Sequence, residues 1–439
     1  MNESVKVIGA GLAGCEAAWQ LAENGINVEL FEMKPKGMSA AHVSPMFAEL
    51  VCSNSFRGND LTNAVGLLKE EMRRLGSLII TTADETKIPA GGALAVDRER
   101  FSEKVTKKVR NHSNITVIES SVSEIPAGKV IIATGPLTSD LLFEQIAALF
   151  PDKKMLHFFD SAAPVITYVS IDLSEAYFAS RYDKGEPDYI NCPMDKEQYI
   201  TFRNALITAE TAPVHGFEKK LVFEGCIPIE VMAERGEDTM RFGPLKPVGL
   251  RDPRTGVEPY AVVQLRKDNT EGTLYNIVGF QTHLKFNEQK RIFGMIPALR
   301  NTEIVRYGVM HRNTYLDSPD LLDKYYRLKN NTDIRFAGQI TGVEGYVESA
   351  ASGLLAGLET AREVQAKPAL DFSKKTATGA LASYISFGSV SRFQPMNINF
   401  GIIDSLDVKV KDKKSKNLAI SERALNETDE IVKALKRED

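Results

Sequence analysis

The alternation of apolar and polar positions predicts a regular order of elements near the N-terminus. An apolar run at residues 5–8 leads into a glycine-rich turn, and a segment rich in Ala, Leu and Glu then continues to Asn24. A second apolar run covers residues 26–31. Gly25, between the two, is a natural helix terminator, because glycine readily takes the left-handed conformation that ends many helices. The pattern predicts a strand–helix–strand unit over residues 5–32.

The same patterns recur later in the chain. Short apolar runs predict strands at residues 115–118, 130–133 and 334–337, and helical periodicity favours helices over 63–75 and 349–363. Between about residues 160 and 300 the strand–helix rhythm is lost, and this stretch contains aromatic and proline-rich strand-like pieces at 221–223 and 260–265. A charged helix closes the chain. We therefore expect an α/β fold that carries an inserted α+β domain.

Composition narrows the class of protein. Of 439 residues, 43% are hydrophobic and 26% are charged, which suits packed cores and excludes disorder of the whole chain. The formal net charge of -4 excludes a strongly basic nucleic-acid protein but allows a local basic patch. No apolar run reaches the roughly 18 residues of a membrane span, and the first residues do not resemble a signal peptide. We expect a cytoplasmic protein with no membrane partner.

The number and spacing of the four cysteines indicate the redox compartment and the kinds of cysteine site that the chain can form. Few cysteines in a long chain fit a reducing compartment. They show no CxxC spacing, so we expect neither a metal site nor a thioredoxin motif. A cysteine taken alone is more often a small buried hydrophobe than a reactive thiol, and Cys15, directly after the glycine-rich turn, should pack beneath it. The four are Cys15, Cys52, Cys192 and Cys226.

The glycine-rich turn has the spacing of a dinucleotide site, GxGxxG. Its first glycine allows the tight turn, its second lets the backbone approach a pyrophosphate, and its third lets helix and strand pack closely. The helix N-terminus offers free N–H groups to phosphate, and a carboxylate at the end of the second strand can accept from ribose hydroxyls. A purely structural glycine turn is the alternative, but strand, helix and acid all stand where this site requires them. The expected binding residues are Gly9, Ala10, Gly11, Leu12, Ala13, Gly14 and Glu32.

Two later features favour FAD over NAD as the bound dinucleotide. Residues 130–135 form an apolar strand that ends in Ala-Thr-Gly, and residues 336–339 form a second strand that ends in a glycine turn. Both resemble later fingerprints of FAD proteins of the glutathione-reductase type, although Gln339 stands where an Asp is usual, and an ordinary core strand is the alternative. Gly338, Gln339 and Tyr346 would border the flavin. No second GxGxxG occurs, so NADPH or NADH would bind transiently as hydride donor.

These features define the expected domains. We predict a glutathione-reductase-type Rossmann FAD-binding domain formed by residues 1–155 and 301–400. It would be interrupted by an insertion domain on the substrate and folate side at residues 156–300. A basic, helical tail would follow at residues 401–439. The length agrees, because roughly 150 residues per domain gives two or three units.

Several longer motifs occur together and in order along the chain. They resemble those of the folate- and FAD-dependent tRNA (uracil-5-)-methyltransferase family, and the likeness runs from residue 5 to about 400. The longer glucose-inhibited division proteins are more distant relatives. The motifs are Gly9–Gly14, residues 47–55 (FAELVCSNS), residues 89–98 (PAGGALAVDR), Glu224-Gly225-Cys226 and residues 342–346 (GVEGY).

The resemblance implies a cytoplasmic enzyme that methylates a tRNA uridine at T-loop position 54. The one-carbon unit would come from 5,10-methylenetetrahydrofolate, and the reductant would be reduced FAD, with NAD(P)H re-reducing the flavin. A related branch acts on 23S ribosomal RNA instead, so the RNA target stays open. No obligate protein partner is expected. The resemblance also implies that His283 stacks on the folate pterin, although a satisfied surface histidine is the alternative for this residue.

The chemistry asks for one reactive thiol and one acid/base, because uracil C5 becomes nucleophilic only after a thiolate adds to C6. The family's two essential cysteines correspond to Cys226 and Cys52. We expect Cys226 to be the nucleophile and Cys52 the acid/base, with the reverse assignment open. Arg98 belongs to a family motif, but the expected reaction does not assign it a role.

RNA contact must come from local basic patches. The candidates are Arg241, Lys246, Arg251 and Arg254 in the insertion, and the lysine run from Lys409 to Lys416. A solvated face is the alternative for each. Three other readings of the whole chain are a small-molecule FAD oxidoreductase, a non-enzymatic flavoprotein scaffold and an S-adenosylmethionine methyltransferase. The last should lack both later strand motifs.

Overall fold

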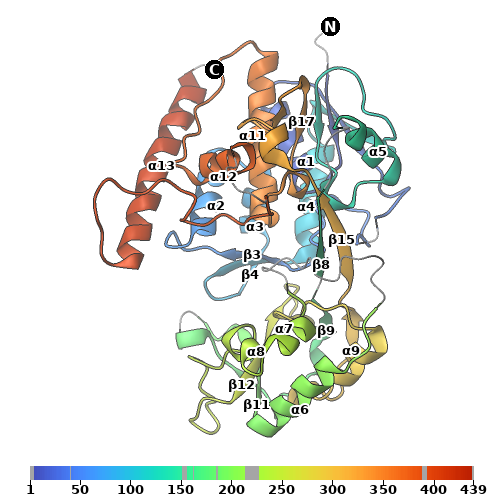
Figure 1. Cartoon of the computed structure of the whole chain (residues 1–439), viewed down its shortest axis with the longest axis vertical. Coiled ribbons are helices and arrows are strands. Elements are labelled where there is room, and N and C mark those ends of the chain that lie inside the picture. Colours follow the sequence, from blue (N-terminus) through green and yellow to red (C-terminus); the bar gives the residue numbers. More distant parts are fainter. Residues whose placement is uncertain are drawn as a thin grey trace.

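The computed structural model shows two lobes, each built around its own sheet and buried core (Figure 1). It describes residues 4–39, 41–150, 156–161, 163–183, 186–212, 227–387 and 393–437. The first lobe contains the core residues from Val5 to Phe150 and from Tyr315 to Ile431. The second lobe contains those from Ile166 to Leu299.

The first lobe is centred on a mostly parallel sheet in the order β16-β17-β7-β1-β2-β6. β1 pairs in parallel with β2 on one side and β7 on the other, while β16 alone runs antiparallel to its neighbour β17. Because parallel strands end at one edge, all five carboxyl ends open toward the same side. The strands are β1 (Val5–Ile8), β2 (Val28–Glu32), β6 (Ile115–Glu119), β7 (Val130–Ile132), β16 (Arg327–Leu328) and β17 (Asn331–Phe336).

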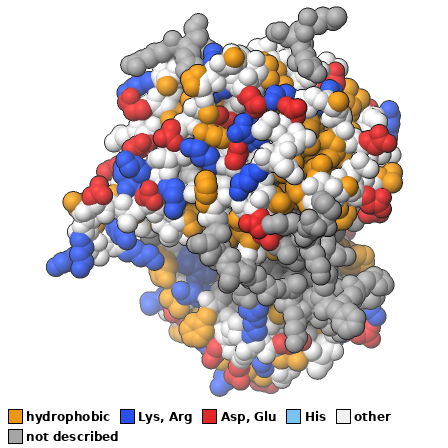
Figure 2. Space-filling view, turned by 45° about the horizontal axis from the view of Figure 1, so that its top comes forward, with side chains coloured by type: hydrophobic (Ala, Val, Ile, Leu, Met, Phe, Trp, Pro, Cys, Tyr) orange, Lys and Arg blue, Asp and Glu red, His pale blue; other side chains and the backbone are white. Residues whose placement is uncertain are grey.

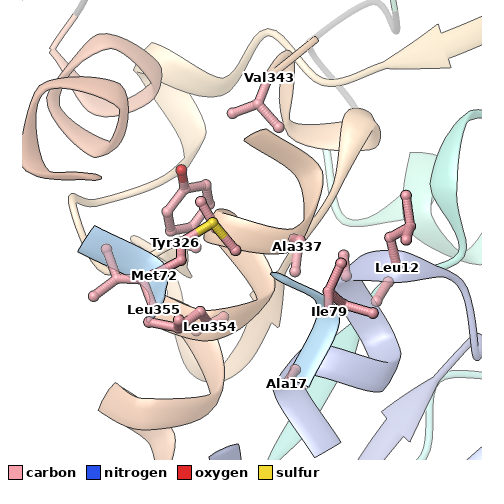
Figure 3. Packing of buried hydrophobic residues seen from close by; sticks show 14 of the residues in the cluster. Leu12, Ala17, Met72, Ile79, Tyr326, Ala337, Val343, Leu354 and Leu355 are labelled. Atoms are coloured by element: carbon pink, nitrogen blue, oxygen red, sulfur yellow. The ribbon is translucent and has the colours of Figure 1, made fainter. Parts of the chain in front are cut away.

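Helices cover this sheet, and the closest pair is α1 against α11. A side chain at Gly353 would lie 2.1 Å from the Ala13 carbonyl oxygen, and one at Gly357 would lie 2.5 Å from that of Ala17. The Ala- and Gly-rich sequence of α11 therefore permits the close crossing, and larger residues such as Leu354 and Leu355 fill the space beside it (Figure 3). The helices are α1 (Leu12–Glu23), α2 (Ala64–Arg74), α3 (Leu78–Glu85), α4 (Arg98–Arg110), α5 (Asp140–Ala148), α10 (Ser318–Leu321), α11 (Tyr346–Val364), α12 (Ala377–Ser386) and α13 (Lys413–Arg437).

The second lobe is an antiparallel sheet in the order β10-β11-β12-β13-β9-β14 with helices packed against it. Its core contains Tyr199 and Phe202 of α6, and the ring of Phe202 lies 6.0 Å from that of Phe280. The elements are β9 (Val165–Thr167), β10 (Tyr177–Phe178), β11 (Tyr189–Met194), β12 (Ala261–Lys267), β13 (Leu274–Ile277), β14 (Ile304–Arg306), α6 (Lys196–Ile207), α7 (Ile229–Arg235), α8 (Thr239–Phe242) and α9 (Phe286–Phe293).

Two small sheets lie where the lobes meet (Figure 1). β8 (Leu156–Ser161) pairs with β15 (Met310–Tyr315), so the chain enters and leaves the second lobe through adjacent strands. The other small sheet has the order β3-β5-β4, from β3 (Ser55–Gly58), β5 (Ala93–Val96) and β4 (Lys87–Ile88).

Most expected elements form, with shifted ends. The expected strand at residues 26–31 begins at Val28, and the expected helix at 349–363 begins three residues earlier, at Tyr346. The final helix begins at Lys413, inside the lysine run rather than after it. It packs on α2 through buried residues such as Ile420 and Ala424 and contributes to the first core. The expected strand at 221–223 lies outside the described residues.

Candidate functional site

A pocket opens at the carboxyl edge of the parallel sheet. The residues that follow β1, β2, β6, β7 and β17 all contribute to its wall, as do α1, α11 and the loop before β3. This edge is where doubly wound α/β folds bind their ligands. Of the residues singled out in the sequence, the pocket brings together Gly9, Gly11, Leu12, Ala13, Glu32, Cys52, Gly338, Gln339 and Tyr346.

The three glycines of the first turn stand in three different environments. Gly9 has a positive φ of 98°, and a side chain there would lie 2.8 Å from the carbonyl oxygen of Ala133. A side chain at Gly14 would lie 1.8 Å from the Gly9 carbonyl oxygen, so this residue lets helix and turn touch. One at Gly11 would meet no protein atom within 4 Å. No side chain therefore covers the backbone on the pocket side of Gly11, so a phosphate could approach the backbone there.

Glu32 is held in place by the turn itself. One of its carboxylate oxygens accepts the backbone N–H of Ala10 at 2.7 Å, and the other accepts that of Lys34 at 2.9 Å. Two ionised carboxylate oxygens have about four acceptor positions, so capacity for further hydrogen bonds remains. Ala10 is fully buried, and Gly14 does not reach the pocket surface, so these two shape the turn without lining the pocket.

The late glycine turn forms the opposite wall. Gly338 has a positive φ of 85°, and its N–H donates to the Ser352 hydroxyl at 2.6 Å, which fixes the turn on α11. Gln339 donates its amide N–H to the carboxylate of Glu344. The neutral side chain at this position is therefore tied to an acid five residues further along the chain.

Cys52 lies in the half-buried loop before β3, and the hydroxyl of Tyr346 holds this loop. The Tyr346 oxygen accepts the backbone N–H of Cys52 at 2.7 Å and that of Ser53 at 3.1 Å. Burial raises the pKa of the Tyr346 phenol, and the neighbouring Cys52 raises it further, so the hydroxyl stays neutral. A neutral phenol whose oxygen accepts two bonds still has its own proton to donate.

The second lobe contacts the same loop through β12 and through the residue that follows this strand. The Arg266 guanidinium donates to the Ser53 hydroxyl at 2.7 Å and to the Asn54 side-chain oxygen at 3.1 Å. Arg98, at the start of α4, donates to the Leu50 carbonyl and pairs with Asp268 at 2.8 Å. Both partners of that pair are almost fully buried. Because the loop carries Cys52, the placement of this thiol depends on how the two lobes dock.

The remaining candidates lie elsewhere. His283 is in the second lobe, between β13 and α9, and is not among the described residues that line the pocket. Its backbone N–H donates to Glu230 at 2.9 Å, and its ring Nδ1 lies against the same carboxylate. Cys226 lies outside the described residues. Cys15 is buried beneath the turn, where its thiol donates to the Ala10 carbonyl at 3.3 Å, and Cys192 is buried in the second core.

Sequence reasoning missed part of the pocket wall and all of the contacts between the lobes. Ser120 and Ser121 line the pocket because they follow the end of the parallel strand β6. The rule that ligands bind at strand carboxyl ends could have identified them. Arg266 and Asp268 give no comparable signal, because their partners are about 170 or more positions away.

Comparisons with known proteins agree on one family. The family model of glucose inhibited division protein A matches residues 4–368. A curated protein of Acetivibrio thermocellus, named methylenetetrahydrofolate--tRNA-(uracil-5-)-methyltransferase TrmFO, is 59% identical over 98% of this chain and 99% of its own length. A protein of Bacillus licheniformis with the same name is 58% identical over 99% of this chain and all of its own.

A solved structure shares the fold at low sequence identity. The structure of Aquifex aeolicus GidA in its form II crystal superposes with a TM-score of 0.69 at 17% identity, covering 99% of this chain and 76% of that one. Within the described part of this chain, no helix is both long and apolar enough to cross a membrane.

Proposed function

The chain belongs to the family of glucose inhibited division protein A, and we propose that it is a methylenetetrahydrofolate-dependent tRNA (uracil-5-)-methyltransferase that carries FAD. The observation that carries this proposal is near-full-length identity of 57 to 59% to relatives with that name. The presence of Cys52 in the wall of the dinucleotide-type pocket supports it. A small-molecule oxidoreductase would need the same FAD motifs but not Cys52 paired with Cys226.

The pocket residues fit FAD. Gly11 leaves the backbone bare at the N-terminus of α1, which suits the pyrophosphate. Glu32 keeps acceptor capacity for ribose hydroxyls. Gly338 and Gln339 would border the flavin end, together with Tyr346. When bound, FAD supplies the reducing equivalents for the one-carbon unit of 5,10-methylenetetrahydrofolate, and NADPH or NADH restores them.

The chain's own part is to activate and deprotonate the uracil. Thiolate addition to C6 forms one C–S bond and places negative charge on C5, which then bonds to the methylene carbon as one of that carbon's two bonds to folate nitrogen breaks. A base takes the C5 proton as the second of those bonds breaks and folate leaves. A hydride from the reductant completes the methyl group, and expulsion of the thiolate from C6 restores the ring. We assign the nucleophile to Cys226, on the resemblance of its motif, and the acid/base to Cys52. A thiol is a workable base near neutral pH when its surroundings lower its pKa.

Three finer assignments belong to the same proposal. His283 contacts the folate pterin, and this requires that folate reach from the pocket toward the second lobe. The RNA target is position 54 of the tRNA T loop, with a 23S ribosomal RNA uridine as the alternative. Exposing that uridine requires the enzyme to flip it out of the loop. The cytoplasmic location stays a prediction from the resemblance.

The function is tested by incubating the protein with unmodified tRNA, 5,10-methylenetetrahydrofolate and NAD(P)H, then mapping 5-methyluridine. Modification at position 54 supports the proposal, and a parallel reaction with 23S RNA fragments checks the alternative target. A yellow protein that consumes NAD(P)H without modifying either RNA would favour a small-molecule oxidoreductase. A coloured protein that binds RNA without turnover would favour a scaffold.

The cysteine roles are tested with 5-fluorouridine RNA, because fluorine at C5 cannot leave as a proton and the adduct persists. Peptide mapping should place the adduct on Cys226. An adduct on Cys52 would reverse the two assignments. An adduct on neither cysteine would contradict the mechanism while leaving the overall reaction open.

A further inference from the structure

A polar groove lies on the first lobe beside the pocket. Its walls come from β3, from the start of α2, from residues 398–401 and from the first turn of α13. The side chains that matter here are basic or amide groups, and Asp412 is the acid among the groove's lining residues. They are Arg57, Asn63, Asn399, Lys413, Lys414 and Asn417.

The groove is separated from the pocket by the first turn of α11. Tyr346 and Ser349 of that turn line the pocket, and Glu348 between them faces the groove side. Glu348 pairs with Arg57 and accepts the backbone N–H of Ile398 at 2.9 Å. Arg57 is five residues after Cys52, so the two are at most about 18 Å apart along the chain. The groove is therefore a neighbour of the site and not a distant surface.

The lysines at its far end are available for a partner. Every lysine of the run Lys409–Lys416 is exposed, and none forms an ion pair with a carboxylate in the described part of the chain. Asp412, within the run, caps the helix by accepting the Ser415 N–H at 2.7 Å. Figure 1 shows α13 (red) beginning at the end of the first lobe that faces the second, and blue side chains project from this flank in Figure 2.

Two members of the other basic patch, Arg241 and Arg254, already have partners among the described residues. Arg241 lies over the ring of Tyr260 at 3.7 Å and pairs with Asp238. Arg254 pairs with Asp252 at 2.7 Å. An existing ion pair reduces what such a guanidinium gains by binding phosphate, and this also holds for Arg57 of the groove, which pairs with Glu348. The structure therefore favours the exposed lysine run over Arg241 and Arg254 as the phosphate contact.

We propose that this groove and the lysine run bind the phosphate backbone of the RNA whose uridine enters the pocket. The inference rests on the proposed function, since it takes RNA as the substrate. A chain with net charge -4 needs a local cationic track to hold a polyanion. The amides of Asn399 and Asn417 each donate one N–H to a backbone carbonyl, and each has a second N–H that can reach a phosphate oxygen along such a track. Contacts of this kind position the RNA without reading its sequence.

The test is the double variant K413Q/K414Q, with K433Q/K436Q at the other end of the same helix as the matched control. Labelled unmodified tRNA is titrated against each protein between about 50 and 200 mM salt. We expect the groove variant to bind about tenfold more weakly and to show a salt slope smaller by about one to two. Its KM for tRNA should rise, while kcat at saturating tRNA and flavin content stay as in the parent protein. The control pair should behave as the parent.

Unchanged affinity and salt slope in K413Q/K414Q would overturn the inference, as would an equal loss in the control pair. A change in self-association with unaltered RNA binding would assign the surface to a protein contact instead, and would also overturn it. Failure of the parent protein to bind or methylate tRNA would contradict the proposed function and is distinguishable from all of these.

Discussion

The hydroxyl oxygen of Tyr346 accepts the backbone N–H of Cys52 at 2.7 Å, although the two residues are 294 positions apart. This bond joins the first residue of α11 to the loop that carries the thiol. The Tyr346 ring also packs near Phe56, with ring centroids 5.9 Å apart. The ring and the hydroxyl therefore do different things: the ring packs, and the hydroxyl sets the position of Cys52.

Replacing Tyr346 by Phe separates these contributions. The ring still packs, but the N–H groups of Cys52 and Ser53 lose their acceptor, which costs about 1–3 kcal/mol. We expect flavin content to be retained and kcat to fall about ten- to a hundredfold, because the thiol is no longer held in place. The control is Tyr384→Phe, which removes a hydroxyl that donates to the Gln394 carbonyl away from the pocket. Equal activity in Tyr346→Phe and the parent would contradict this role.

The buried pair of Arg98 and Asp268 should couple the lobes strongly. Removing one partner leaves a charge buried without compensation, so Arg98→Met should lower the free energy of unfolding by about 3–5 kcal/mol. Arg98→Met with Asp268→Leu should recover much of that loss. The exposed pair of Arg100 and Glu271 joins the same two segments, and Arg100→Met should cost less than about 1 kcal/mol. Denaturant unfolding of the parent and these three variants checks this, and a double variant no more stable than Arg98→Met would contradict it.

The assignment of the pyrophosphate position is tested at Gly11. Gly11→Val puts a branched side chain where we place the phosphate, so the variant should fold and lose most of its flavin. Gly92→Val is the matched control, because a side chain there also meets no protein atom within 4 Å but is outside the pocket. The absorbance of purified protein reports the flavin content. Full flavin content in folded Gly11→Val would show that the site is misplaced.

One stability prediction concerns Glu71, whose carboxylate accepts the N–H groups of Ala377 and Thr378 at the start of α12. Burial raises the pKa of Glu71 to about 7 in spite of these bonds. The folded state then holds a proton that the unfolded state releases above its ordinary pKa of about 4.5. The proton on Glu71 stabilises the folded state in full below pH of about 4.5, and this stabilisation is lost as pH rises through about 7. Its size is about 3 kcal/mol.

Glu71→Gln should therefore flatten the dependence of unfolding free energy on pH across that interval, whereas Glu70→Gln should leave it in place. Glu70 is the neighbouring partly exposed acid and pairs with Arg73 and Arg74. The measurement is denaturant unfolding at several pH values between about 4.5 and 7. A parallel pH profile for Glu71→Gln and the parent would show that Glu71 titrates as an ordinary carboxyl.

The features that could be predicted from sequence are those with local causes. The βαβ unit follows from apolar spacing and from Gly9, which needs its positive φ, and Glu32 follows from its place at a strand end. The late turn at Gly338 carries a similar local pattern. Such features depend on residues within a few positions of one another, so a single chain is enough to reveal them.

The contacts between distant segments of the chain could not be predicted from the sequence. The contact of Arg266 with Ser53 joins residues 213 positions apart, and no local pattern encodes such a partner. The exposure of the lysine run at 409–416 could not be predicted from the sequence either, because it depends on how α13 packs on α2. The folate contact of His283 stays a prediction from the resemblance, and in the structure its ring lies against the Glu230 carboxylate.

The source of the transferred carbon tests the central claim most directly. The protein is incubated with unmodified tRNA, NAD(P)H, 5,10-methylenetetrahydrofolate labelled with carbon-13 in its methylene group, and unlabelled S-adenosylmethionine. Mass spectrometry of the nucleosides then reports the label in 5-methyluridine. The account predicts that the new methyl group carries the carbon-13 and that no product forms when folate is omitted. Unlabelled 5-methyluridine made from S-adenosylmethionine in a folate-free reaction would contradict it.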